Sequence, residues 1–581
     1  MGRASRAKRE RRQNASAEVI RHAGKADRRG LRVGTTLSAH VDAVRRRGAD
    51  GLAEALIARH NRRMANLNAA ARHFSPNAFA VLHPMITMDT ASWQLGQRVL
   101  KHPCDYGATW LEHLGWAADS ASIAIRYLLC GQVIAASVVV RSQLERWTEN
   151  ASVNAQMPQL EGEATAAWID RLMSPVEESG RVLEQPEAPV AVASQVGTLF
   201  SDAANPGSVG QDYEAMSEVL HGRGPLLSLV RWEAQGLLAP GTQPSVEEIG
   251  GVLRPLQVAL RRVREGLAAA ALGRGYSFTA QRLATVTEVR NDGVAIENVQ
   301  ALLFPLEPMA LNSESFARAS GEVADQYRAI VEGRPGPDLP AEVIPALAFG
   351  ERRYRAHHFS RRALQHEAAV LGEKFDDEAI SETLTEMVFA AECSASLASW
   401  VEPERIEVSD AFAAGSSALR STVWMWLEDD DRAMGCGRTV LEMVARLRTF
   451  RLKPQKAAQL AAQPRTTPRD WIDAAGWRRL SLLNSALGDL AHAPRRAASA
   501  RETLVMLQID PDSELASKTG RTSAVNMLIF LLQVECGRWV DSLDATLGAA
   551  FWEVVRLDPT TADQGLEPIM RHAWNLRTAR R

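Results

Sequence analysis

Two stretches of the chain place an arginine and a glutamate four residues apart at the end of an apolar run. RSQLERW contains Arg141 and Glu145, and RTVLEMV contains Arg438 and Glu442. Residues four apart lie on the same face of a helix. Because the run before Arg141, CGQVIAASVVV, is apolar nearly all round, it is typical of a central helix, and a charge at its end needs a polar partner.

Each pair is followed by an acidic residue three positions before a histidine. YEAMSEVLHG contains Glu218 and His221, and LNSALGDLAHA contains Asp489 and His492. Each histidine closely precedes a glycine or a proline, which predicts a position at a helix C-terminus, where the helix dipole favours the imidazolium form. A histidine in that setting can act as a general acid or base.

The same residues support a second interpretation. An arginine paired with a glutamate, and an acid that reaches a histidine, can tie two buried helices together as a polar latch with no chemistry. The sequence leaves the active site and the latch open.

The two stretches echo each other at a constant offset. Counting from Arg141 to Arg438, residues about 300 apart superpose without a gap over about two dozen positions, and the acid/His stretches follow in the same order. The identical pairs are Ala121 and Ala418, Ala136 and Ala433, Arg141 and Arg438, Leu144 and Leu441, and Glu145 and Glu442. We therefore predict an internal duplication of a helical unit.

The order of these motifs resembles a known family. VVVRSQLERW followed by YEAMSEVLHG, an Arg-x-x-x-Glu helix and then a Tyr-x-x-x-Ser-x-x-x-His helix, is similar to bacterial all-helical domains of unassigned function related to HEPN-like folds. The resemblance covers residues 110–225 and, more weakly, residues 410–495. In the second copy Asn484 and Gly488 stand where the first has Tyr213 and Ser217, which suggests that this copy has lost part of any site.

The resemblance implies metal-independent RNA cleavage. His221 would activate the ribose 2′-hydroxyl, and Arg141 would steady the charge of the phosphate. Glu145 and Glu218 would complete the first site, and Arg438, Glu442, Asp489 and His492 are their counterparts in the second copy.

Catalytic HEPN proteins carry an arginine four to six residues before a histidine, and this spacing clusters in ERRYRAHHFSRRALQH. Arg353, His358, Arg361 and His366 in this stretch are candidates for contacts with nucleic acid. An exposed basic helix is the alternative.

A di-iron helical bundle is a third interpretation of the carboxylates. Glu145, Glu218 with His221, Glu442, and Asp489 with His492 follow the order of the ligands in carboxylate-bridged di-iron sites. An arginine one turn before two of these glutamates would repel a metal, so no metal or cofactor is expected.

Composition limits the classes of protein. A formal net charge of −2 gives no overall attraction to nucleic acid or membranes, and the seven lysines leave 60 arginines, which indicates codon bias. Five widely spaced cysteines without a C-x-x-C pair favour a reducing cytoplasm. No apolar run reaches transmembrane length, so no membrane association is expected.

Helical periodicity and the Pro/Gly-rich stretches predict an all-α chain. We expect a basic mobile tail over 1–35, a first helical unit over 36–237, a helical middle segment over 238–340 and a second helical unit over 341–581. Residues 283–304 form either one small β-hairpin or two short helices.

The leading hypothesis is an HEPN-like cytoplasmic protein associated with RNA or another nucleic acid, and acting as a ribonuclease in stress or phage defence. The alternative is a non-catalytic helical scaffold for a protein partner or a homo-oligomer. No phosphate-binding G-x-x-x-x-G-K-S loop, dinucleotide motif or serine nucleophile elbow occurs.

Overall fold

The computed structural model describes, with short gaps, residues 36–63, 120–173, 209–235, 252–285, 325–334, 377–492 and 520–562. All secondary structure in these ranges is helical, and they contain no strand. The prediction of an all-α chain is therefore confirmed.

The first half of the described chain contributes α4 (Val133–Asn154), α5 (Thr165–Met173), α7 (Val209–Leu220), α8 (Leu227–Gln235) and α10 (Ser277–Thr285). The second half contributes α15 (Asp377–Trp400), α16 (Ile406–Leu427), α17 (Ala433–Leu452), α18 (Pro454–Ala461), α19 (Pro468–Ala474), the 3₁₀ turn η2 (Arg478–Leu480), α20 (Ser481–His492), α22 (Gly520–Leu543) and α23 (Ala545–Val554).

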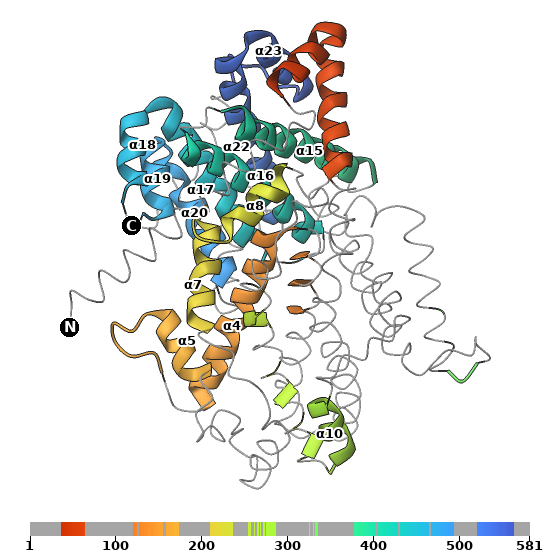
Figure 1. Cartoon of the computed structure of the whole chain (residues 1–581), viewed down its shortest axis with the longest axis vertical. Helices are drawn as coiled ribbons and strands as arrows, with labels where there is room; N and C mark the ends of the chain where they lie inside the picture. The colour runs from red at the N-terminus through yellow and green to blue at the C-terminus, as the bar shows by residue number, and fades with distance from the viewer. Residues whose placement is uncertain are drawn as a thin grey trace, which may run out of the picture.

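Helix α16 is the centre of the bundle. Every residue from Ala411 to Leu427 is buried, so this helix has no solvated face. It packs against α15, α17 and α22, and also contacts α4 and α8 from the first half (Figure 1). The buried apolar residues of both halves thus form one continuous core.

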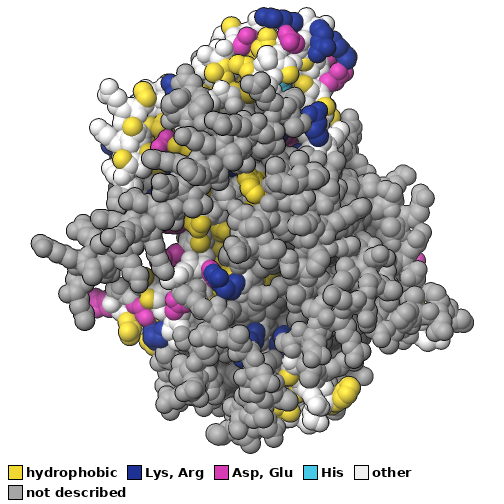
Figure 2. Space-filling view, in the orientation of Figure 1, with side chains coloured by type: hydrophobic (Ala, Val, Ile, Leu, Met, Phe, Trp, Pro, Cys, Tyr) yellow, Lys and Arg dark blue, Asp and Glu magenta, His cyan; other side chains and the backbone are white. Residues whose placement is uncertain are grey.

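The chain before α4 supplies a further piece of this core. Residues 37–63, the N-terminal helical segment, are helical and are drawn in red in Figure 1. The segment turns at Gly48, whose φ of +60° suits a glycine, and a Cβ on Gly51 would lie only 2.3 Å from the Ala43 carbonyl oxygen. The top of Figure 2 shows basic and acidic side chains close together. Two exposed ion pairs within the segment join Arg47 to Glu54 and Arg45 to Asp42.

Two expectations from the sequence need correction. The apolar helix does not end at Arg141, because α4 continues for three more turns and places this arginine in its middle. Residues 283–285, which would begin the first strand of the hairpin, are helical in α10, and residues 286–304 lie outside the described residues.

The middle segment is helical where it is described. All described residues between 252 and 272 are helical, and they lead into α10. Arg264 in this stretch is buried and donates hydrogen bonds to the carbonyl oxygens of Leu283 and Ala284 at the end of α10. These bonds satisfy carbonyl groups that a helix C-terminus leaves without a partner.

The predicted tail (1–35) and the boundary stretches at 238–244 and 335–340 lie outside the described residues. Helix α4 packs against α7, and α17 packs against α20, so an Arg/Glu helix meets an acid/His helix in both halves. The duplication itself stays a prediction. None of the helices in the described ranges combines the length and apolarity that a membrane span requires.

Candidate functional site

Helix α7 ends at Leu220, and His221 follows it directly as the C-cap, so the predicted position at a helix C-terminus is observed. The N–H of Gly222 donates to the carbonyl of Val219, and the N–H of Arg223 donates to the carbonyl of Glu218, which is the hydrogen-bond pattern of a Schellman motif. Gly222 has a φ of +57°, the left-handed conformation that this motif requires. The turn therefore places His221 at the C-cap, directly after the last residue of the helix.

The partner of His221 comes from the other half of the chain. Its Nδ1 lies 2.8 Å from Oε2 of Glu442 on α17, and the imidazole is 28% exposed while the carboxylate is 1% exposed. The other oxygen of Glu442 accepts a hydrogen bond of 2.7 Å from Arg446, whose guanidinium lies over the ring of Trp471, 4.8 Å from its centroid. A fixed carboxylate therefore holds a partly exposed imidazole.

The charges around Glu442 decide its protonation. Burial alone would raise the pKa of this carboxyl, but Arg446 and His221 more than offset that effect and lower the pKa to about 2. Glu442 is thus ionised at neutral pH. A carboxylate on Nδ1 favours the neutral imidazole tautomer whose Nε2 carries a free lone pair.

Arg141 and Glu145 form a second cluster with Tyr213 of α7. Arg141 pairs with Glu145 at 3.0 Å, and the Tyr213 hydroxyl donates to the same carboxylate oxygen at 2.6 Å. Burial, although opposed by Arg141, raises the pKa of Tyr213 to about 12, so the hydroxyl stays protonated. The Arg141 guanidinium also lies over the tyrosine ring, 5.0 Å from its centroid.

The two clusters are separate. Tyr213 and His221 are eight residues apart on α7, which corresponds to about 12 Å along a helix. Glu218, the remaining first-copy candidate, is exposed and forms no side-chain hydrogen bond or ion pair within the described residues. The structure therefore joins His221 to Glu442 rather than to Arg141 and Glu145.

The residues of the predicted second copy are arranged differently from those around Arg141. The guanidinium of Arg438 lies against Gly488 of α20, where an added Cβ would come within 3.3 Å of Nη1. The absence of a side chain at Gly488 thus leaves room for this arginine. Asp489 and His492 belong to α20, but their side chains, like Arg353, His358, Arg361 and His366, lie outside the described residues.

The described residues do not assemble the di-iron ligand set. Glu145 and Glu442 are bound in different clusters, each by an arginine. No group of three or more histidines, cysteines, aspartates or glutamates that could hold a metal ion occurs in the described part of the chain.

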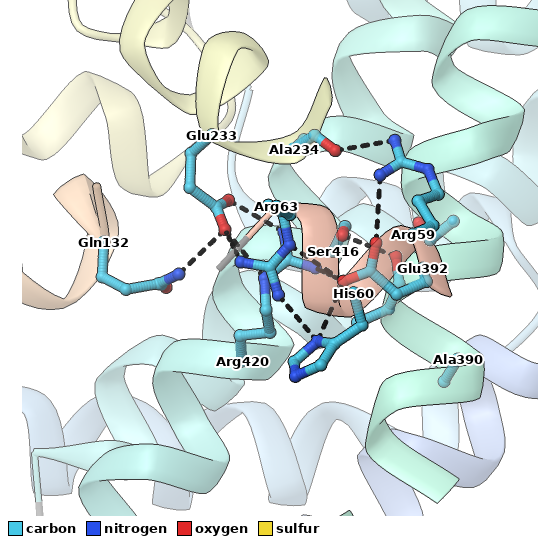
Figure 3. A network of polar contacts seen from close by, with 12 residues as sticks. Arg59, His60, Arg63, Gln132, Glu233, Ala234, Ala390, Glu392, Ser416 and Arg420 are labelled. Carbon is cyan, nitrogen blue, oxygen red and sulfur yellow. Dashed lines mark hydrogen bonds and ion pairs between the residues drawn. The ribbon is translucent and has the colours of Figure 1, made fainter. Parts of the chain in front are cut away.

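A larger polar cluster, which the sequence analysis missed, lies inside the bundle (Figure 3). Glu233 at the end of α8 binds Arg420 of α16 through two bonds of 2.8 Å and also accepts from Arg63 at 2.9 Å. Glu392 of α15 accepts from Arg63 at 2.9 Å and from Arg59 at 3.0 Å. We call the full set the buried charge network; its members are Arg59, His60, Arg63, Gln132, Glu233, Glu392, Arg420 and Ser421.

The charged side chains of the network are closed to solvent. The side chains of Arg63, Arg420 and Glu392 are 0% exposed. Burial opposes ionisation of Glu392, but Arg63 and its neighbours hold the pKa of this carboxyl well below its usual value. Three arginines and two glutamates leave one net positive charge in the interior. The bonds among them link the N-terminal helical segment, α8, α15 and α16, and so fix how these elements pack.

One pattern in the sequence could have revealed this network. Glu392 stands alone in the small, apolar run VFAAECSASLAS, and Arg420 stands alone in AAGSSALRSTVWMWL. An isolated charge on a helix that is apolar all round must find a buried partner. The sequence analysis applied this reasoning to Arg141 alone and so found only the cluster of Arg141, Glu145 and Tyr213.

Comparisons with known proteins assign the chain to no class. It matches no protein-family model, and no curated protein or solved structure matches it. The function must therefore be argued from the geometry of these clusters.

We expect Gly222→Ala to weaken the α7 turn and the His221 site together. Alanine is strained at positive φ by about 1–2 kcal/mol, and its Cβ would lie 2.8 Å from Sδ of the buried Met443. Gly275→Ala is a matched control, since Gly275 has a φ of +79° but no atom within 4 Å of the added Cβ. Urea unfolding should show a loss that is about 1 kcal/mol larger for Gly222→Ala; equal losses would mean that Met443 moves aside freely.

Proposed function

We propose that the chain is an HEPN-like, nucleic-acid-associated protein of the cytoplasm that cleaves RNA without a metal ion, with His221 as the general base. The observation that carries this proposal is the 2.8 Å contact between Nδ1 of His221 and the buried carboxylate of Glu442, combined with partial exposure of the ring. The carboxylate orients the imidazole and leaves Nε2 able to take a proton from a ribose 2′-hydroxyl. Three free, buried cysteines (Cys393, Cys436 and Cys536) support the cytoplasmic location.

The proposed reaction is an attack of the 2′-oxygen on the neighbouring phosphorus atom. His221 takes the proton of the 2′-hydroxyl, the bond from phosphorus to the 5′-oxygen breaks, and that oxygen takes a proton from water. The products are a 2′,3′-cyclic phosphate and a 5′-hydroxyl. We assign the phosphate contact to Arg223, two residues after His221, because among the described residues it forms no side-chain hydrogen bond or ion pair, whereas Glu145 and Tyr213 already engage Arg141.

The test is cleavage of a fluorescent single-stranded RNA by purified protein in EDTA. We expect His221→Ala to lower kcat/KM by about 10²- to 10⁴-fold, and Arg223→Met to lower it as well. Glu214→Gln, a change at an exposed position of the same helix, should leave cleavage unchanged. A DNA strand of the same sequence should stay intact because it lacks the 2′-hydroxyl. RNA that stays intact, or that His221→Ala cleaves as fast as the unaltered protein, would refute the proposal.

A non-catalytic helical scaffold is the second candidate. It is favoured by the bonds that tie the α7–α8 region to the central helices: besides the His221–Glu442 pair, Arg231 of α8 binds Asp410 of α16 through contacts of 2.5 and 2.7 Å. Under this proposal the chain binds a protein partner or a second copy. His221→Ala would then lower the free energy of unfolding and leave RNA intact.

A further inference from the structure

Two buried histidines lie on the face that the N-terminal helical segment presents to the bundle. His40 and His60 are each 3% exposed, and both contact α15, His40 at the Trp400 ring and His60 at Glu392. A buried histidine at the junction of two elements couples their packing to pH, because protonation puts a charge where water cannot reach it.

The surroundings of His40 have no place for a second proton. Its Nδ1 lies 3.2 Å from the Thr36 carbonyl oxygen and must donate to it, so Nε2 carries the lone pair. Nε2 is buried and has no hydrogen-bond partner, and the Trp400 ring packs edge to face at 4.9 Å between centroids. Burial lowers the pKa of His40, the bond to Thr36 partly offsets this, and the positive charge of Arg59 lowers the pKa further.

His60 lies inside the buried charge network, between an arginine and a glutamate. Its Nδ1 is 3.0 Å from Nη2 of Arg63 and 3.3 Å from Oε1 of Glu392. A guanidinium can only donate, so Nδ1 accepts the shorter bond and carries no proton. A proton on this nitrogen would break the bond to Arg63.

Charged groups from four elements face His60: Glu392, 3.3 Å away, and Glu233 attract a second proton, whereas the three arginines oppose it. Arg59 and Arg63 come from its own segment, Glu392 from α15, Arg420 from α16 and Glu233 from α8. Their sum is already one positive charge, and a proton on His60 would raise it to two. In water both histidines can bind a proton without these costs. Protonation therefore favours the state in which the segment has left the bundle.

We propose that residues 37–63 form an acid-releasable segment, which leaves its place against α8, α15 and α16 when His40 and His60 become protonated. Release exposes both histidines and both glutamates to water, while α16 keeps its packing against α17 and α22. The device resembles histidine switches that work near pH 6. It is independent of RNA cleavage at His221.

The linkage fixes the size of the effect. A histidine that titrates near 6.5 in the released state and stays neutral in the docked state makes release about tenfold more favourable at pH 5.5 than at pH 7.5. His40 alone gives this tenfold change, and His60 extends it to at most about 100-fold because Glu392 partly compensates its proton. Stability of the docked state is therefore present above pH 6.5 and is lost as the pH falls below it.

Hydrogen exchange of the full chain, read by mass spectrometry and corrected for the intrinsic pH dependence of exchange, tests the proposal. The opening constant of peptides within 37–63 should rise by about 10- to 100-fold from pH 7.5 to pH 5.5, and that of α16 and α17 should change little. The double variant His40→Phe/His60→Asn keeps a ring against Trp400 and an acceptor for Arg63, yet cannot be protonated. It should lose most of the pH dependence.

His40→Phe alone leaves the charge network intact and should remove about tenfold of the effect, which gives a readout even where the double variant does not fold. The proposal is overturned by an opening constant that is the same at both pH values, by loss of protection in α16 and α17 at the same pH as in 37–63, or by variants with the pH dependence of the unaltered protein.

Discussion

Glu392→Gln is expected to lower the free energy of unfolding by about 3–5 kcal/mol, because it leaves buried arginines without their counter-charge. Glutamine keeps the shape of the side chain, but its amide nitrogen donates hydrogen bonds where Arg59 and Arg63 need acceptors. One carboxylate, Glu233, would then face three guanidinium groups in an interior closed to water.

Urea unfolding at pH 7.5 measures this loss. Glu382→Gln on the same helix is the matched control, since the Glu382 side chain is 65% exposed and its contact with Arg556 is long, at 3.6 Å. The control should change the free energy of unfolding by less than about 0.5 kcal/mol. A loss at Glu392 as small as that of the control would mean that water or a rearranged glutamate compensates the arginines.

At low pH the unaltered protein is expected to lose the extra free energy of unfolding that it has over the Glu442→Gln variant. The pKa of Glu442 is about 2 in the folded chain, below its ordinary value of 4.5, so the unfolded chain binds the proton first. A lowered carboxyl pKa stabilises the fold above pH 4.5, and this stabilisation is lost as the pH falls toward 2. The difference between the unaltered protein and Glu442→Gln should therefore narrow by about 2 kcal/mol from pH 6 to pH 3.

Urea midpoints and slopes at pH 6, 5, 4 and 3 give this comparison directly. Glu214→Gln, an exposed change on α7, serves as the control and should run parallel to the unaltered protein at every pH. If the difference for Glu442→Gln stays constant over this range, the carboxylate is not held by Arg446 and His221 as the geometry indicates.

Local rules were enough to predict the helices and the ends that matter for the site. The apolar run before Arg141 and the glycine after His221 gave a buried helix and a helix C-terminus, and both are present. The sequence also predicted a polar partner for Arg141, and Glu145 and Tyr213 fill that role.

The partners of the isolated charges could not be predicted from periodicity. His221 and Glu442 are 221 residues apart, and Arg59 and Glu392 are 333 residues apart. Spacing along one helix states which side chains share a face, but it does not state which distant helix that face meets. For this reason the sequence assigned His221 to its own half of the chain, and it left the buried charge network unseen.

The long separation of Arg59 from Glu392 along the chain affects folding during translation. Synthesis proceeds from the N-terminus at about 5–20 residues per second, so the segment that carries Arg59 waits roughly 15–70 s before its carboxylate partner is made. During this interval its apolar face and its arginines are open to solvent and to other chains. The buried charge network therefore forms only after α15 has been made.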